Sequence, residues 1–343
     1  MKKLLNTLYV LSENTYLSLK NENVVLNYED GSHKELPLLG IESIFCFSYK
    51  GASPALLGEC ARRGIGVSLY TPTGRFLSQA CGRMQGNVLL RKEQYRASDD
   101  AERSCEIARG FIFGKIYNSR WCIERTLRDH ALRVDSETLD RASAYLADSA
   151  KEALKAEDLD TLRGIEGQAA NAYFGVFNEM ILNQKESFVF GGRSRRPPLD
   201  RVNALLSFGY SLLKSDCAAA LEGVGLDSYV GFMHRDKPGR ESAALDLMEE
   251  LRSVLTDRMV LTMINMRQIV PGDFKSFEDG AVLLNEDGRK KFITAWQAHK
   301  REEIMHPYLK EKMQWGLVPH VQALLLSRYL RGDLDAYPAF LWK

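Results

Sequence analysis

One carboxylate, that of Glu166, stands out in the segment LRGIEGQAANAYF over residues 162–174. At helical spacing, Leu162, Ala169 and Tyr173 fall on the same side of a helix as this acid, in a stripe of apolar and small side chains. Burying a carboxylate without a partner costs several kcal/mol. We therefore expect a positive charge beside Glu166, either an arginine that makes the acid structural or a bound cation that makes it functional.

A second polar cluster begins at His234, in a loop that leads into the segment SAALDLMEELR. On a helix, Ser242, Asp246 and Glu249 form a polar stripe at i, i+4 and i+7, apart from the apolar face. A loop histidine is more often structural, and an acidic helix face is usually only solvated. Together with Glu166, however, two carboxylates and an imidazole form a ligand set for a hard divalent ion, with positions left for water and substrate oxygens. An oxygen-rich set with one histidine favours Mg²⁺ or Mn²⁺ over a structural zinc.

A third candidate is a loop rich in arginine, GGRSRRPPLDR, which precedes an expected helix. Guanidinium groups bind phosphate oxygens in bidentate fashion, so the loop is a candidate phosphate-binding segment. A loop that is merely solvated is the equally weighted alternative. The candidate residues are Arg193, Arg195, Arg196 and Arg201.

The amino-terminal residues that precede these clusters have a β pattern. Short β-branched or aromatic runs, separated by turn residues such as Asp30-Gly31, predict strands and a single helix. The expected strands are Thr7–Leu11, Thr15–Lys20, Val24–Tyr28, Ile44–Ser48, Gly66–Tyr70 and Arg75–Ala80, and the expected helix is Pro54–Arg63.

The rest of the chain has a helical pattern, because apolar residues recur at helical spacing and no proline occurs between Pro72 and Pro197. A long helix is expected after the cap-like Ser98-Asp99-Asp100. Further helices are expected at about 136–154, 158–183, 200–222, 241–260, 287–313 and 317–331. The predicted fold class is therefore α+β, with a small β domain over 1–95 and a larger all-α domain over 96–343 that carries the candidate metal site.

Composition limits the function classes. The 343 residues are 45% hydrophobic and 27% charged, as in an ordinary globular chain. Lys and Arg number 46 against 45 Asp and Glu, so nucleic-acid binding must rely on local patches. The six cysteines form no close pair and are expected to be reduced core residues. No apolar run reaches the ~20 residues of a membrane span, and we expect a cytoplasmic protein.

Several long motifs in order resemble the CRISPR-associated adaptation integrase family, the metal-dependent DNA endonucleases of spacer acquisition. The motifs are LRGIEGQAANAYF, PLDRVNALLSFGYSLL, GLDSYVGFMH and SAALDLMEELR. The ending RYLRGDLDAYPAFLWK is similar to variants from type I systems. The resemblance covers essentially the whole chain.

The resemblance implies catalytic metal ligands at Glu166, His234 and Glu249. The third position is commonly aspartate in this family, so Asp246 is the alternative ligand or else a group that orients His234. By this resemblance, a metal held there would polarise the scissile phosphate, and the nucleophile in integration would be a prespacer 3′-hydroxyl that attacks the repeat boundary. The resemblance also implies double-stranded DNA substrates, a homodimer, and a small ferredoxin-like CRISPR-associated partner dimer. An exposed β edge in the amino-terminal residues, which contain no catalytic constellation, leads us to expect that the domain over 1–95 forms much of the homodimer contact.

From the residues themselves two other function classes stay open. The acidic cluster is also compatible with a non-catalytic nucleic-acid scaffold. It is equally compatible with a metal-dependent hydrolase of a small phosphorylated substrate. Metal-dependent cleavage or joining of branched DNA distinguishes the three.

Overall fold

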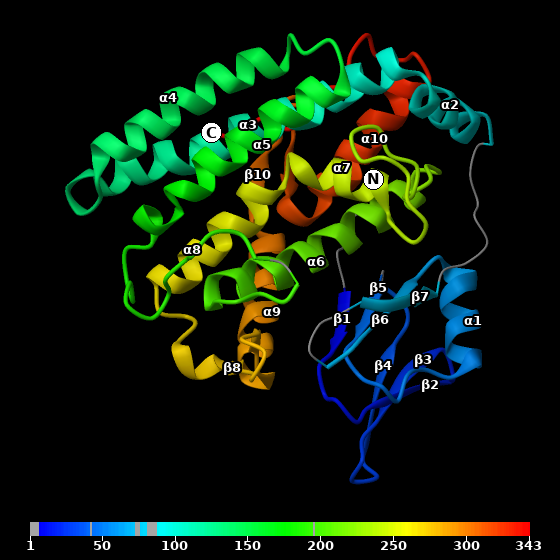
Figure 1. Cartoon of the computed structure of the whole chain (residues 1–343). Coiled ribbons are helices and arrows are strands. Elements are labelled where there is room, and N and C mark those ends of the chain that lie inside the picture. Colours follow the sequence, from blue (N-terminus) through cyan, green and yellow to red (C-terminus); the bar gives the residue numbers. More distant parts are fainter. Residues whose placement is uncertain (1–6, 42, 73–75, 81–87, 195) are drawn as a thin grey trace.

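The computed structural model describes residues 7–41, 43–72, 76–80, 88–194 and 196–343, and Figure 1 shows them as two parts. The amino-terminal part is built from strands and one helix, and the larger part is mainly helical. This arrangement confirms the α+β fold class. Within those residues no helix combines the length and the apolar composition needed to cross a membrane.

The amino-terminal part contains two small sheets and helix α1. The first sheet has the order β1-β5-β6-β7, with β1, β5 and β6 parallel and β7 antiparallel. The second is the antiparallel meander β2-β3-β4. The bounds are β1 Thr7–Val10, β2 Tyr16–Lys20, β3 Asn23–Asn27, β4 His33–Pro37, β5 Ser43–Cys46, α1 Pro54–Arg63, β6 Gly66–Tyr70 and β7 Phe76–Ala80.

Strand β4 is absent from the predicted set, because His33, Lys34 and Glu35 do not form a β-branched or aromatic run. Its pairing with β3 is what places it in the sheet. The first residue of the expected strand Arg75–Ala80 lies outside the described residues. The expected helix Pro54–Arg63 is confirmed. Its Ser53 side chain accepts a hydrogen bond from the backbone N–H of Leu56, as an N-cap residue should.

The helical part has a long central helix surrounded by others. Its helices are α2 Val88–Asp99, α3 Ala101–His130, α4 Ser136–Ala153, α5 Leu159–Gly175, α6 Arg201–Gly223, α7 Ser242–Glu249, α8 Arg258–Asn265, α9 Glu286–Arg301 and α10 Val318–Leu330. A π-helical segment, Arg252–Asp257, lies between α7 and α8. Two hairpins complete this part, formed by β8 Phe274–Ser276 with β9 Val282–Leu284 and by β10 Glu303–Met305 with β11 Lys312–Gln314.

Three expected helices differ in length from those observed. The helix expected over 287–313 ends at Arg301, where Glu302 turns to extended backbone and β10 begins. The helix expected over 241–260 is divided by the π-helical segment. The helix expected over 158–183 ends at Gly175. The proposed boundary between residues 95 and 96 falls inside α2, and α2 packs on α3 and α10.

Aromatic side chains join the first sheet to the helical part. Phe47 is fully buried, stacks on Tyr70 with ring centroids 4.9 Å apart, and lies 5.9 Å from the ring of Phe208 on α6. The Tyr70 hydroxyl is hydrogen-bonded to the Ser215 hydroxyl at 2.5 Å, also on α6. These rings extend the apolar core of the helical part into the first sheet, while the rest of the amino-terminal part has a separate core of its own.

Helix α3 is the element that places the candidate site. It packs against α4, α5 and α7, the last two of which carry Glu166 and Glu249. Buried Asn118 on α3 donates hydrogen bonds to the backbone carbonyls of Glu250 and Phe340. These contacts fix α3 against the end of α7 and against the carboxy-terminal segment. Five described cysteines are buried and free, as expected, while Cys81 lies outside the described residues.

Candidate metal centre

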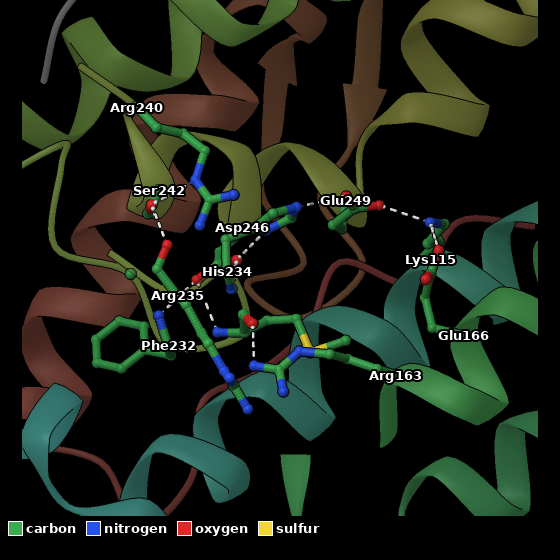
Figure 2. A network of polar contacts seen from close by, with 12 residues as sticks. Lys115, Arg163, Glu166, Phe232, His234, Arg235, Arg240, Ser242, Asp246 and Glu249 are labelled. Carbon is green, nitrogen blue, oxygen red and sulfur yellow. Dashed lines mark hydrogen bonds and ion pairs between the residues drawn. The ribbon is translucent and has the colours of Figure 1, made fainter. Parts of the chain in front are cut away.

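The imidazole of His234 is held by Asp246, one of the two acids that the sequence left as rivals. Asp246 is completely buried on α7, and its Oδ1 lies 2.6 Å from Nδ1 of His234. Its two oxygens also accept the backbone N–H groups of Phe232, Met233 and His234, at 2.6, 3.0 and 3.0 Å. In the neutral ring, a carboxylate that accepts at Nδ1 places the proton on that nitrogen and leaves the lone pair on Nε2. The free lone pair faces Glu249, whose Oε1 lies 4.0 Å from Nε2 (Figure 2).

The loop before His234 lies very close to α7. A Cβ at Gly231 would lie 2.7 Å from Cβ of Ser242 and 2.9 Å from Oδ2 of Asp246. Such a contact is too short for any side chain, so only glycine fits. The close approach is what brings three successive backbone N–H groups onto Asp246.

Glu249 is almost completely buried at the end of α7, between two cations. Its Oε1 is 2.8 Å from Nη2 of Arg252, and its Oε2 is 2.8 Å from Nζ of Lys115 on α3. Burial acts to raise the pKa of this carboxyl, but the charges of Arg252 and Lys115 outweigh it and lower the pKa to about 2. The side chain is therefore an anion at every pH at which the protein is expected to work.

Glu166 projects from α5 toward the same lysine. Its Oε1 forms an ion pair with Nζ of Lys115, and its side chain is 26% exposed against 5% for Glu249. Figure 2 shows Lys115 between the two glutamates. The positive charge expected beside Glu166 is thus a lysine that serves both acids.

These residues fit a divalent cation in their donor chemistry. Two carboxylates and an imidazole line the same cavity, and a cationic ammonium already lies between the carboxylates. In the described part of the chain, no three histidine, cysteine, aspartate or glutamate side chains are gathered closely enough to hold a metal ion as they stand. Glu166 and Glu249 are instead bridged by Lys115. Asp246 is the less suitable ligand because both of its oxygens are already engaged.

The acids open into a cavity of about 540 Å³. Besides the candidate ligands, its walls carry four arginines that the sequence analysis did not select: Arg163, Arg235, Arg240 and Arg252. Arg163 and Arg235 both contact Asp160, at 2.6 and 3.3 Å. The available signal was the basic character of the segment that follows His234, which contains Arg235 and Arg240.

Two of the three described arginines of the arginine loop are engaged within the protein. Arg193 donates a hydrogen bond to Asn203 and lies over the rings of Phe174 and Tyr210, at 5.9 and 5.3 Å. Arg201 donates to the backbone carbonyl of Ser187 at 2.8 Å. Arg196 is exposed, and Arg195 lies outside the described residues. A phosphate-binding role for this loop stays a prediction, with Arg193 and Arg201 already engaged inside the protein.

The comparison with known proteins settles the family. The model of the CRISPR-associated protein Cas1 family matches residues 8–298. The chain belongs to the Cas1 family. It is 49% identical over 343 residues to a CRISPR-associated endonuclease Cas1 of Chlorobaculum tepidum, with all of both chains covered. It is also 49% identical to a Cas1 endonuclease of Rhodospirillum rubrum, again with both chains fully covered.

Solved structures share the fold of this Cas1 family member at low sequence identity. A Cas1 protein of Thermotoga maritima superposes with a TM-score of 0.81 at 22% identity, over 97% of this chain and 99% of the other. A casposase bound to an integration product superposes with a TM-score of 0.84 at 22% identity, over 99% and 95%. The fold expected from the resemblance is therefore confirmed.

Proposed function

We propose that this chain is a metal-dependent DNA endonuclease and integrase of CRISPR spacer acquisition. The named endonucleases among its full-length relatives support the activity, and the casposase bound to an integration product supports the integrase reaction. The observation that carries the proposal is the presentation of His234 Nε2 toward Glu249 by a buried Asp246, inside a cavity lined by arginines.

Glu166, His234 and Glu249 would hold the ion, and their oxygen-rich donor set favours Mg²⁺ or Mn²⁺. When bound, the ion supplies Lewis acidity at the scissile phosphate. Asp246 keeps the proton of His234 on Nδ1, so that Nε2 remains a donor atom. The nucleophile in integration is the 3′-hydroxyl of a prespacer, which displaces the 3′-oxygen of the repeat strand; in simple cleavage the nucleophile is water.

The arginines of the cavity would bind the DNA backbone beside the ligands. Arg235 is 76% exposed and its nearest acid, Asp160, is 77% exposed, so a phosphate can replace that partner at little cost. Guanidinium groups suit phosphate oxygens geometrically. We assign Arg163, Arg235 and Arg240 to this role, together with the exposed Arg196 of the arginine loop.

Similar proteins support a proposal about the partners. A Cas6-RT-Cas1–Cas2 complex contains a chain that superposes with a TM-score of 0.83 at 22% identity, over 99% of this chain and 36% of that one. We propose that this chain likewise works as a homodimer with a small ferredoxin-like partner dimer, and that the amino-terminal part, residues 1–95, contributes the dimer contact. Light scattering of the purified chain, alone and with the partner, tests both assemblies.

Cleavage and joining of branched DNA test the activity itself. The wild-type protein should act in Mg²⁺ or Mn²⁺ and stop in excess EDTA, and Glu166→Ala and His234→Ala should be inactive while still folded by circular dichroism. DNA binding without cleavage in any metal would support the scaffold alternative. Hydrolysis of small phosphate esters without any action on DNA would support the hydrolase alternative.

A further inference from the structure

We propose that Lys115 competes with the metal ion for its binding position. Before the ion binds, Lys115 holds Glu166 and Glu249 together, and this competition sets how tightly the ion binds. The inference rests on the proposed metal-dependent function. It concerns a residue on α3 that belongs to none of the motifs singled out in the sequence.

The placement of Lys115 is specific. Its side chain is only 11% exposed, and its Nζ is in ion-pair contact with both acids, at 2.8 Å from Oε2 of Glu249. The two acids come from different helices, α5 and α7, and α3 packs against both. One ammonium therefore joins two elements that would otherwise present like charges to each other.

The charge balance makes Lys115 a substitute for an ion. Glu166 and Glu249 bring two negative charges, and Lys115 and Arg252 bring two positive charges beside them. A divalent ion bound by both carboxylates would lie a few ångströms from the ammonium, where like charges repel strongly because the surroundings are poorly solvated. The ion and the lysine cannot both keep these contacts. Metal binding must therefore displace Nζ from at least one carboxylate.

The displaced ammonium has space beside it that contains some polar groups. Lys115 also borders a small cavity of about 20 Å³, whose lining includes Ser119, Tyr210 and Asp257. A volume of this size holds about one water-sized group. The four-carbon stem of lysine is flexible enough to make such a shift without movement of α3.

The test measures binding of Mn²⁺ to the full chain by isothermal titration and by electron paramagnetic resonance, without DNA. Lys115→Met removes the competing charge, so its Kd for Mn²⁺ should be at least tenfold lower than that of the wild type. Its melting temperature without metal should fall, because the two carboxylates then repel, and it should rise more on addition of Mn²⁺ than that of the wild type. Lys115→Gln, which keeps a polar end, replaces the methionine variant if that variant folds poorly. It should also bind Mn²⁺ more tightly than the wild type.

A matched control is Lys300→Met. Lys300 is 5% exposed and its Nζ lies 2.8 Å from Oδ2 of Asp216, so it is also a buried lysine paired with a carboxylate, but it is not part of the metal cavity. This variant should lose stability without a change in Mn²⁺ affinity. An unchanged or weaker Mn²⁺ affinity in Lys115→Met and Lys115→Gln would overturn the inference. Absence of Mn²⁺ binding in the wild type and in every variant would overturn the proposed metal site itself.

Discussion

At the scale of single residues, the centre assigns different tasks to two acids of one helix. Asp246 and Glu249 are three positions apart on α7, and both are buried. Asp246 is satisfied by three backbone N–H groups and the ring of His234, whereas the partners of Glu249 at 2.8 Å are the cationic side chains of Lys115 and Arg252. Glu249 can exchange its contacts with charged side chains for contacts with a metal ion. Asp246 cannot, because its oxygens hold the backbone of the His234 loop in place.

This difference predicts distinct phenotypes. Glu249→Gln should abolish metal-dependent cleavage, because a ligand and its charge are lost. Asp246→Asn should leave a residue of activity, lower by about 10–100-fold and partly restored by more Mn²⁺, because His234 is only misoriented. It should also cost about 1–3 kcal/mol of unfolding free energy, since an amide N–H group then faces backbone donors. Cleavage assays with a Mn²⁺ titration and urea unfolding measure both effects. The reverse order of activities would transfer the ligand role to Asp246.

A second residue-scale prediction concerns the buried Asp257, which accepts hydrogen bonds from Tyr173 and Tyr210. Burial raises its pKa from 3.8 to about 6, although the two tyrosines oppose the shift. Between pH 3.8 and about pH 6, the folded state keeps a proton on Asp257 that the unfolded chain loses. The contribution of Asp257 to the free energy of unfolding therefore falls as pH rises through this range, by up to about 3 kcal/mol. In Asp257→Asn this slope should disappear. Urea unfolding from pH 4 to pH 7 measures it, and equal slopes for both proteins would contradict the assignment.

The sequence predicted the candidate ligands but not the cation that bridges them. The apolar stripe around Glu166 indicated that a positive charge must lie nearby. Lys115 could not be selected, because it is 51 residues away and lies on a helix with several other basic residues. Only the packing of α3 against α5 and α7 distinguishes it from them. The sequence could not predict the inward position of Arg193 for the same reason, since that position also depends on tertiary packing.

At the scale of elements, the site depends on the contact between the His234 loop and the first turn of α7. Gly231→Ala should displace this loop, since its methyl group would meet Ser242 and Asp246 at under 3 Å. We expect nearly complete loss of metal-dependent cleavage. Gly164→Ala on α5 is the control, because its methyl group would meet no atom within 4 Å apart from the adjoining backbone of its own helix, and helical alanine is favoured by roughly 0.5–1 kcal/mol. Cleavage rates and melting temperatures of the two variants decide whether the close approach matters.

Most helices and strands were predicted because the sequence itself contains their start signals and their spacing of apolar residues. The N-capped helix α1 and the long helix after Asp100 have clear start signals, and Asp100 does cap α3. The pattern cannot show where tertiary contacts interrupt a helix. After Arg301 the chain pairs as the hairpin β10–β11 and buries His306 against Gln322, although its residues continue a helical spacing. The π-helical segment after α7 is likewise set by its packing on α3 and α6.

At the scale of the whole molecule, the sheet and the helices should unfold together. Phe47→Ala removes a buried ring from the contact between the two parts and should cost about 3–5 kcal/mol. Circular dichroism follows the whole fold, whereas the four tryptophans all lie in the helical part. Both signals should shift equally in urea. Tyr49→Ala, at a 71% exposed position, should shift neither. Separate transitions in the wild type would show that the parts are energetically independent.

The hydrogen bond from Asn118 to the carbonyl of Phe340 spans 222 residues, and this span has a consequence for the time course of synthesis. At ribosomal rates of about 5–20 residues per second, α3 waits roughly 10–45 s for that partner. In the interval α3, α4 and α5 can already pack, and Lys115 can pair with Glu166. Glu249 arrives later. A nascent chain therefore holds one acid beside one lysine, and the candidate metal centre is complete only when α7 has been translated and packed on α3.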